Sequence, residues 1–220
     1  MKQSTYPRSV LPAISRHIEL AGIAFEGLYY KFFLMKTYNF VAISGSLRKG
    51  SYNTMVLKTL QKIAPKHIKI KQLLIDDVPF YNSDLHEKKF PANVEKLNDA
   101  IKKADAIIFV TPEYNYSVPG VLKNALDMFS RSPKKPFNLK PVGIMGASPG
   151  LLGTARAQYH LRQIMVFLNA YTMNQPEIMI GKVNEKFNAD EQLTDKETSD
   201  LLLKFLEALA DFSDTINSKK

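Results

Sequence analysis

From residue 37 onward, nearly continuous apolar runs alternate with segments whose apolar residues recur at helical spacing. Continuous apolar runs are typical of parallel strands that are buried on both faces of a sheet. Five strand–helix units in succession therefore favour an open, doubly wound α/β sheet with right-handed crossovers. The expected strands are 38–43, 68–74, 105–110, 141–146 and a fifth near 171–180, and the expected helices are 51–64, 91–103, 119–131, 153–169 and 193–216.

A doubly wound sheet binds its ligands beyond the carboxyl ends of its strands. The candidate site therefore consists of the three loops 44–53, 111–118 and 147–153, which follow the first, third and fourth expected strands. Each loop has a composition that points to a particular kind of contact.

The first loop is rich in small and hydroxyl-bearing residues and leads directly into a helix. The free N–H groups and the positive dipole end of a helix N-terminus attract anions. Hydroxyls add neutral donors, and Arg48 can add a charged, bidentate contact, so the sequence predicts a phosphate site. The loop is not a P-loop, because Ser51 and Tyr52 stand where that motif has Lys and Ser or Thr, and no Rossmann G-x-G-x-x-G occurs in the chain.

The second loop carries two tyrosines and an asparagine between Pro112 and Pro119. Flat tyrosine faces and a carboxamide suit a planar heteroaromatic ring with polar edges. Tyrosines that only cover the end of the sheet are the alternative interpretation. The phosphate loop expected on the same rim favours a ring site.

The third loop contains G-x-S-x-G around Ser148, which is the pattern of the hydrolase nucleophile elbow. Pro149 lacks the N–H that an oxyanion hole needs at this position. No histidine follows His160 and no acid lies between it and Ser148, so the order of a hydrolase triad is also missing. The glycines instead favour close approach of the backbone to a bound ring.

Composition narrows the classes of chemistry further. The 220 residues include no cysteine, which excludes disulfides, thiolate nucleophiles and cysteine-ligated metals. The four histidines are scattered, so no metal site is expected. The net charge of +9 is dispersed among acidic residues, which indicates a solvated surface and no nucleic-acid partner.

Residues 1–36 differ in character from the rest of the chain. Charged residues interrupt the semi-apolar stretch from Ile18 to Leu34, so the sequence predicts no membrane span and only a poor secretory signal. Two interpretations stay open: an extension packed on the surface, or a start codon assigned upstream of the true one. We expect the domain to occupy 37–220, with no membrane partner and a cytoplasmic location.

Three segments, GSLRKGSYN (45–53), PEYNYSVPGVLKNALDMFSR (112–131) and GASPGLLGTARAQYHLR (146–162), together resemble the NADPH-dependent FMN reductase family. This family includes bacterial quinone, azo-dye and chromate reductases, and the resemblance runs from about Thr37 to the final helix. It implies a flavodoxin-like fold with five strands in the order 2-1-3-4-5. It also implies FMN as cofactor, NADPH or NADH as co-substrate, and a homodimer or homotetramer with contacts through Val121–Arg131.

The resemblance also implies roles for individual residues. The FMN phosphate would be held by Ser46, Arg48, Ser51, Asn53 and Thr54. The isoalloxazine ring would be lined by Pro112, Glu113, Tyr114, Asn115 and Tyr116, with Ser148 and Gly150 near its other flank. The family often has Gly-Gly where Leu152-Gly153 stand, which puts the shape of the third loop in question. It often has Trp where Met128 stands, which bears on the floor beside the flavin or on a subunit contact.

The function implied by the resemblance is an FMN-dependent NAD(P)H oxidoreductase. Hydride would pass through flavin N5 in a ping-pong cycle to a small-molecule acceptor such as a quinone, an azo dye, chromate or free flavin. No catalytic side chain is needed, and main-chain N–H groups from Glu113 to Asn115 would stabilise charge on the reduced ring. Two alternatives are a non-enzymatic flavodoxin-like electron carrier or flavin sensor, and an interaction module that uses the basic surface. The carrier is less favoured, because flavodoxins resemble one another in a T-x-T-G-x-T loop and an acidic surface that this chain lacks.

Overall fold

The computed structural model describes residues 36–86 and 90–218. The predicted extension 1–36 therefore lies outside the described residues, apart from Lys36. The fold below is that of the unit Tyr38–Lys220. Within the described residues, no helix combines the length and the apolar character that crossing a bilayer requires.

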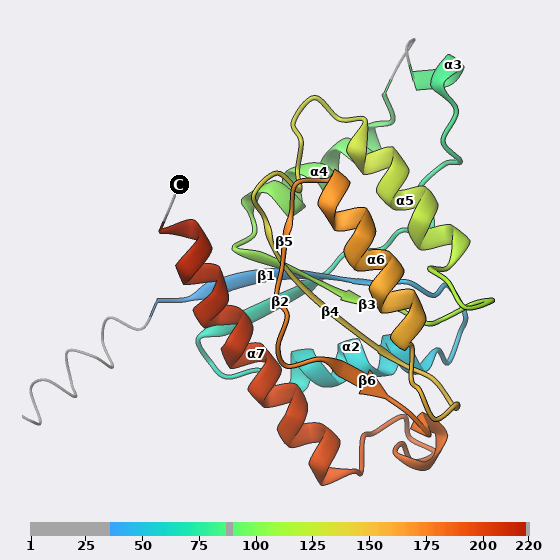
Figure 1. Ribbon diagram of the computed structural model, residues 1–220, viewed down its shortest axis with the longest axis vertical. Coiled ribbons are helices and arrows are strands. Elements are labelled where there is room, and N and C mark those ends of the chain that lie inside the picture. The colour runs from blue at the N-terminus through green and yellow to red at the C-terminus, as the bar shows by residue number, and fades with distance from the viewer. Residues whose placement is uncertain (1–35, 87–89, 219–220) are drawn as a thin grey trace, which may run out of the picture. The chain divides into compact units, whose positions relative to one another are not determined.

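A parallel sheet forms the centre of this unit (Figure 1). Its main path follows the order β2-β1-β3-β4-β5, which confirms the predicted flavodoxin-like topology. The strands are β1 (Tyr38–Ser44), β2 (Ile68–Gln72), β3 (Ala106–Val110), β4 (Pro141–Ala147), β5 (Tyr171–Thr172) and β6 (Ile178–Ile180).

The fifth expected strand is two short strands, so the prediction of five strands is wrong by one. Both β5 and β6 pair with β4, but in different registers: Pro141 pairs with Tyr171, whereas Met145 pairs with Ile178. The segment between them contains Pro176, and a proline has no N–H for a ladder hydrogen bond. The chain therefore leaves the sheet after β5 and rejoins it in β6, next to the end of β4.

The five long helices predicted from the sequence are present, with their ends shifted by a few residues. A short helix, α3, lies in the connection after β2 and is not among the helices expected from the sequence. The helices are α2 (Tyr52–Ile63), α3 (Ser83–His86), α4 (Ala92–Lys103), α5 (Gly120–Ser130), α6 (Ala155–Phe167) and α7 (Lys196–Asn217), with a 3₁₀ turn η1 (Val183–Glu185).

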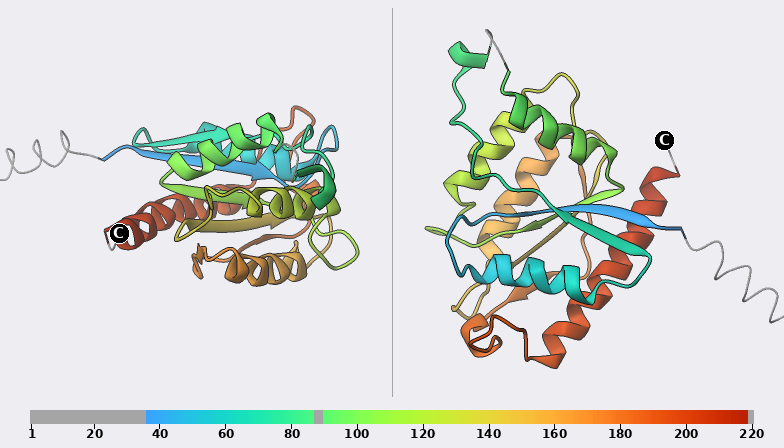
Figure 2. Two further views of the ribbon diagram at one scale, coloured as in Figure 1. Left: turned by 90° about the horizontal axis from the view of Figure 1, so that it is seen from above. Right: turned by 180° about the vertical axis from the view of Figure 1, so that it is seen from behind.

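The long helices cover both faces of the sheet (Figure 2). Successive residues of a strand point to opposite faces, and here both faces are apolar. In β1, Phe40 and Ala42 pack in the core that includes α2 and α7, while Val41 and Ile43 pack in the core that includes α4, α5 and α6. Burial on both sides explains why the strands read as continuous apolar runs.

Two helix ends are closed by charged side chains. The ammonium of Lys140 donates to the carbonyl oxygens of Lys102 (3.0 Å) and Ala104 (2.5 Å), where α4 ends. At the start of α7, Asp195 is the N-cap residue and accepts from the N–H of Thr198 at 3.0 Å. The pKa of Asp195 is lowered to about 2 by its hydrogen bond from Lys186 and, second, by that from Thr198. Charge placed in this way satisfies terminal backbone groups and complements the helix dipole.

Candidate functional site

The three loops predicted to form the site follow β1, β3 and β4 and lie along one rim of the sheet, on the right-hand side of Figure 1. They are tied to one another directly. The hydroxyl of Ser46 in the first loop lies 3.4 Å from that of Tyr114 in the second. Asn53 reaches from the first loop to Ala147, and Glu113 reaches from the second loop to the helix that follows the third. The three sequence segments thus form one site.

Hydroxyl groups fix the conformation of the first loop. The Ser44 and Thr54 hydroxyls are 3.0 Å apart, so the end of β1 is joined to the first turn of α2. The N–H of Ser46 donates to the Ser44 hydroxyl at 3.4 Å, and the N–H of Arg48 donates to the Ser46 hydroxyl at 3.3 Å. These contacts curl the loop over the start of α2.

The N-terminus of α2 is suited to binding an anion. Ser51 is the N-cap residue, but its hydroxyl does not cap the helix, although the residue is only 4% exposed. The first N–H groups of a helix have no partner within the helix. Within the described residues, Arg48 and Lys49 enter no ion pair. Gly50 has a φ of +66°, a conformation that side chains rarely adopt, and so permits the turn into the helix. These features fit the phosphate of FMN.

A hollow of about 220 Å³ lies against this loop. Besides Ser46 and Arg48, it is lined by the segment Leu73–Asp76, which follows β2. The sequence analysis missed this segment. The strand order contains the signal, because β2 neighbours β1 and its carboxyl end lies on the same rim.

The second loop forms a tight hairpin. Tyr114 and Ser117 exchange two main-chain hydrogen bonds of 3.0 and 3.1 Å, and between them Asn115 and Tyr116 have φ values of 50° and 64°. Two successive left-handed residues are costly outside glycine and are common at ligand-binding loops. The hairpin leaves Tyr114 48% and Tyr116 66% exposed, so both rings keep aromatic surface that a planar ligand could contact.

The Glu113 side chain holds the start of α6. Its carboxylate accepts from the N–H groups of Arg156 (3.0 Å) and Ala157 (3.1 Å), and it also pairs with the Arg156 guanidinium at 3.1 Å. Arg156 in turn lies 4.0 Å from the centre of the Tyr116 ring. Because the Glu113 carboxylate is engaged in this way, only its main chain remains a candidate for contact with a ring.

Two residues of α6 that the sequence analysis missed brace the second loop. They are Arg156, stacked on Tyr116, and His160, whose Nδ1 lies 3.0 Å from the Ser117 hydroxyl. The contact of Glu113 with the main chain of α6 has a local reason at the start of that helix. The first turn of α6 contains no acidic residue, and its N-cap residue, Thr154, makes no capping hydrogen bond through its side chain. A helix start without a local cap needs a partner from elsewhere.

The hydroxyl of Ser148 stabilises the conformation of the third loop. Ser148 donates to the carbonyl oxygen of Gly153 at 2.6 Å and is joined to Ile180 of β6 through its N–H. Within the described residues, the His160 ring hydrogen-bonds to Ser117 and not to Ser148, so the G-x-S-x-G motif has no serine–histidine pair there. Gly153 has a φ of +57°, and a Cβ there would lie 2.7 Å from the main chain of Met179.

The two departures from the family pattern are accommodated in different ways. The side chain of Leu152 is exposed, so it adds bulk outside the loop. Met128 is fully buried among the side chains of the α4–α6 core, and it packs inside the unit. The polar residues of α5 are also engaged within the chain: Lys123 pairs with Asp127 at 2.7 Å, and Asn124 bonds the main chain of Tyr81.

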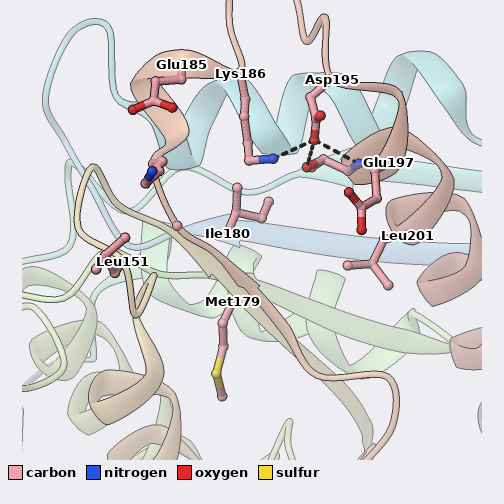
Figure 3. A pocket seen from close by; sticks show the side chains of 11 residues that line it. Leu151, Met179, Ile180, Glu185, Lys186, Asp195, Glu197 and Leu201 are labelled. Atoms are coloured by element: carbon pink, nitrogen blue, oxygen red, sulfur yellow. Dashed lines mark hydrogen bonds and ion pairs between the residues drawn. The ribbon is translucent and has the colours of Figure 1, made fainter.

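A second hollow, of about 490 Å³, lies beside the third loop between β6 and the start of α7 (Figure 3). Leu151, Ile180 and Leu201 provide apolar surface, while Lys186 is already paired with Asp195. Carboxylates occupy the N-terminal end of α7, which disfavours a phosphate there. Within the described residues, no group of three or more His, Asp or Glu side chains is placed to hold a metal ion.

An open parallel sheet with an anion-binding helix start and exposed aromatic faces on one rim defines a flavodoxin-like nucleotide-binding protein. Residues 38–185 match the family model of NADPH-dependent FMN reductases. The chain therefore belongs to the NADPH-dependent FMN reductase family, a family of oxidoreductases that use FMN and NAD(P)H.

Relatives of the chain match it over most of their own length. The chain is 47% identical over 169 residues to an NAD(P)H-dependent FMN reductase of Pseudomonas aeruginosa, covering 77% of this chain and 91% of the relative. It is 49% identical over 175 residues to a quinone reductase of Escherichia coli, and the match covers 78% of this chain and 93% of the relative. Among solved structures, the chain is similar to FerB, a flavoenzyme NAD(P)H:(acceptor) oxidoreductase from Paracoccus denitrificans, with a TM-score of 0.75 and 36% identity. The match covers 81% of this chain and 98% of FerB.

Proposed function

We propose that this enzyme transfers hydride from NAD(P)H through FMN to a quinone or another small oxidised acceptor, such as an azo dye, chromate or free flavin. The observation that carries the proposal is the junction of an uncapped helix start with a tyrosine hairpin. Ser51 leaves the first turn of α2 free for a phosphate, and the Ser46–Tyr114 contact brings exposed aromatic faces beside it.

The phosphate is assigned to four residues of the first loop and α2. The N–H groups at the start of α2 and the hydroxyls of Ser46, Ser51 and Thr54 donate to its oxygens, and Arg48 adds charge. The interior position of Ser51 excludes bulk water from one side of this contact. The Asn53 side chain is engaged elsewhere, so only its main chain is a candidate phosphate donor.

The ring is assigned to the second and third loops. Tyr114 and Tyr116 offer apolar faces, while Ser148 and Gly150 lie on the opposite flank. The Tyr114 N–H is used in the hairpin, which leaves the N–H groups of Glu113 and Asn115 as the candidates for stabilising negative charge on a reduced ring.

FMN held by these residues would supply the redox chemistry, with N5 as the atom through which hydride passes. The protein residues orient the donor and the acceptor and shield one side from water. One open face serves both substrates in turn, which makes the kinetic cycle ping-pong. We propose a homodimer or homotetramer for the assembly, and a cytoplasmic location stays a prediction of the sequence.

The experiment that tests this function is an absorbance spectrum of the purified protein mixed with FMN, followed by anaerobic mixing with NADPH or NADH. The expected result is a bound flavin that bleaches promptly and recovers when a quinone is added. A protein that binds no flavin would overturn the proposal. A bound flavin that neither coenzyme bleaches would favour the electron carrier or sensor.

A further inference from the structure

Asn53 is the most deeply engaged polar side chain of the first loop. It is 3% exposed, and both ends of its carboxamide bond the main chain of one residue. Its Nδ2 donates to the carbonyl oxygen of Ala147 at 2.9 Å, and its Oδ1 accepts from the Ala147 N–H at 2.9 Å. The two residues are 94 positions apart, on α2 and at the end of β4.

The sheet explains why Ala147 needs this partner. The N–H of Thr111 donates to the carbonyl oxygen of Met145, so Met145 faces β3. In a parallel ladder alternate residues face the same neighbour, and Ala147 therefore turns its main-chain groups to the same side. However, β3 ends at Val110, so this strand does not extend far enough to pair with Ala147.

The Asn53 carboxamide therefore takes the place of a missing strand residue. A buried N–H and C=O without partners would cost free energy, and this side chain satisfies both. The same pair of hydrogen bonds ties the start of α2, where a phosphate would bind, to Ala147, the last residue of β4. Ser148 follows directly and is in turn joined to β6.

We propose that Asn53 is a positioning residue that sets the third loop against the flavin ring, and that its side chain does not recognise the phosphate. The inference rests on the proposed FMN site. Loss of the carboxamide loosens the wall beside the ring, so it weakens every ligand that carries the ring, with or without a phosphate.

The test compares FMN with riboflavin, which has the same ring and lacks the phosphate. The dissociation constants of both are measured by flavin fluorescence for the wild type, Asn53→Ala and Asn53→Asp. We expect both variants to weaken both flavins by a similar factor, roughly tenfold for the loss of two buried hydrogen bonds. Asn53→Asp should also weaken flavin binding, because it places a carboxylate oxygen against the Ala147 carbonyl oxygen.

Two control variants show what a loss of phosphate contact alone and a neutral substitution would look like. Ser51→Ala should weaken FMN and leave riboflavin unchanged, since its hydroxyl is free at the helix start. Asn184→Ala, at an exposed asparagine in η1, should change neither affinity. The visible absorption band of bound riboflavin should also shift in Asn53→Ala, which a change in global stability alone would not produce.

The outcomes separate the two proposals. Wild-type protein that binds neither flavin overturns the proposed function itself. If the wild type binds both and Asn53→Ala weakens FMN alone, the side chain recognises the phosphate and the inference is overturned. Unchanged affinity for both flavins overturns it as well, because Asn53 then supports only the fold.

Discussion

The carboxylate of Glu113 holds Arg156 by both its main chain and its guanidinium, at 3.0 and 3.1 Å. One side chain thereby caps α6 and orients the cation that stacks on Tyr116. The helix start and the ring-lining hairpin share a single anchor, so a change at Glu113 should affect stability and flavin binding together.

Glu113→Gln keeps the shape of the side chain and removes its charge. Hydrogen bonds that involve a charged group contribute about 1.5–3 kcal/mol, and we expect a loss of stability toward the lower end because the amide still accepts one bond. Urea unfolding measures the loss, and a flavin titration measures the accompanying weaker binding. Glu185→Gln is the control, at an exposed glutamate of η1. Equal unfolding midpoints for the two variants would contradict the anchoring role.

Arg48→Ala should weaken FMN binding by about 1.5–3 kcal/mol, because a charged phosphate contact is lost. Riboflavin affinity should stay the same. Lys69→Ala removes the same charge from the exposed side of β2 and serves as the matched control. If both variants lose FMN affinity equally, the effect comes from the net charge of the protein and not from a contact.

Tyr114→Ala, unlike Arg48→Ala, should not discriminate between the two flavins. The exposed ring face is lost, together with the 3.4 Å contact to the Ser46 hydroxyl, so FMN and riboflavin should both bind more weakly. Tyr114→Phe keeps the face and should retain most of the riboflavin affinity. Isothermal titration with each flavin distinguishes the variants, and a full loss in Tyr114→Phe would point to the hydroxyl instead of the face.

Lowering the pH should destabilise the start of α7, because the Asp195 carboxylate becomes protonated. Its folded pKa of about 2 lies below the ordinary value of 3.8, so the ionised carboxylate contributes stability above about pH 4 that is lost as the pH falls through 2. Asn also caps helices well and does not titrate. The wild type should therefore exceed Asp195→Asn in unfolding free energy at pH 5, and the difference should shrink toward pH 2. A difference that stays constant across this range would refute the assignment.

Lys140→Met should destabilise the unit by about 1–3 kcal/mol, since the carbonyl groups at the end of α4 lose a buried charged donor. Lys204→Met, at an exposed position on α7, should have little effect. Thermal unfolding of the two variants gives the comparison. Equal melting temperatures would show that water replaces the ammonium without cost.

The sequence was sufficient for the sheet and for the location of the site. Continuous apolar runs identify strands buried on both faces, and β1, β3 and β4 end where those runs end. It was not sufficient to predict which groups the side chains of Asn53 and Glu113 would bond. Both partners are main-chain groups dozens of residues away, and main-chain groups are the same at every position. The division of the last strand also depends on pairing with β4, which no local pattern encodes.

The two edges of the sheet have a consequence for the protein at high concentration. On one side, β5 and β6 are short and differ in register, and on the other, β2 carries the exposed lysines Lys69 and Lys71. Interruption and like charge both discourage a second chain from adding a strand. The described part of the chain therefore presents no long uncharged edge, so crowded copies should resist sheet-to-sheet aggregation during synthesis and storage.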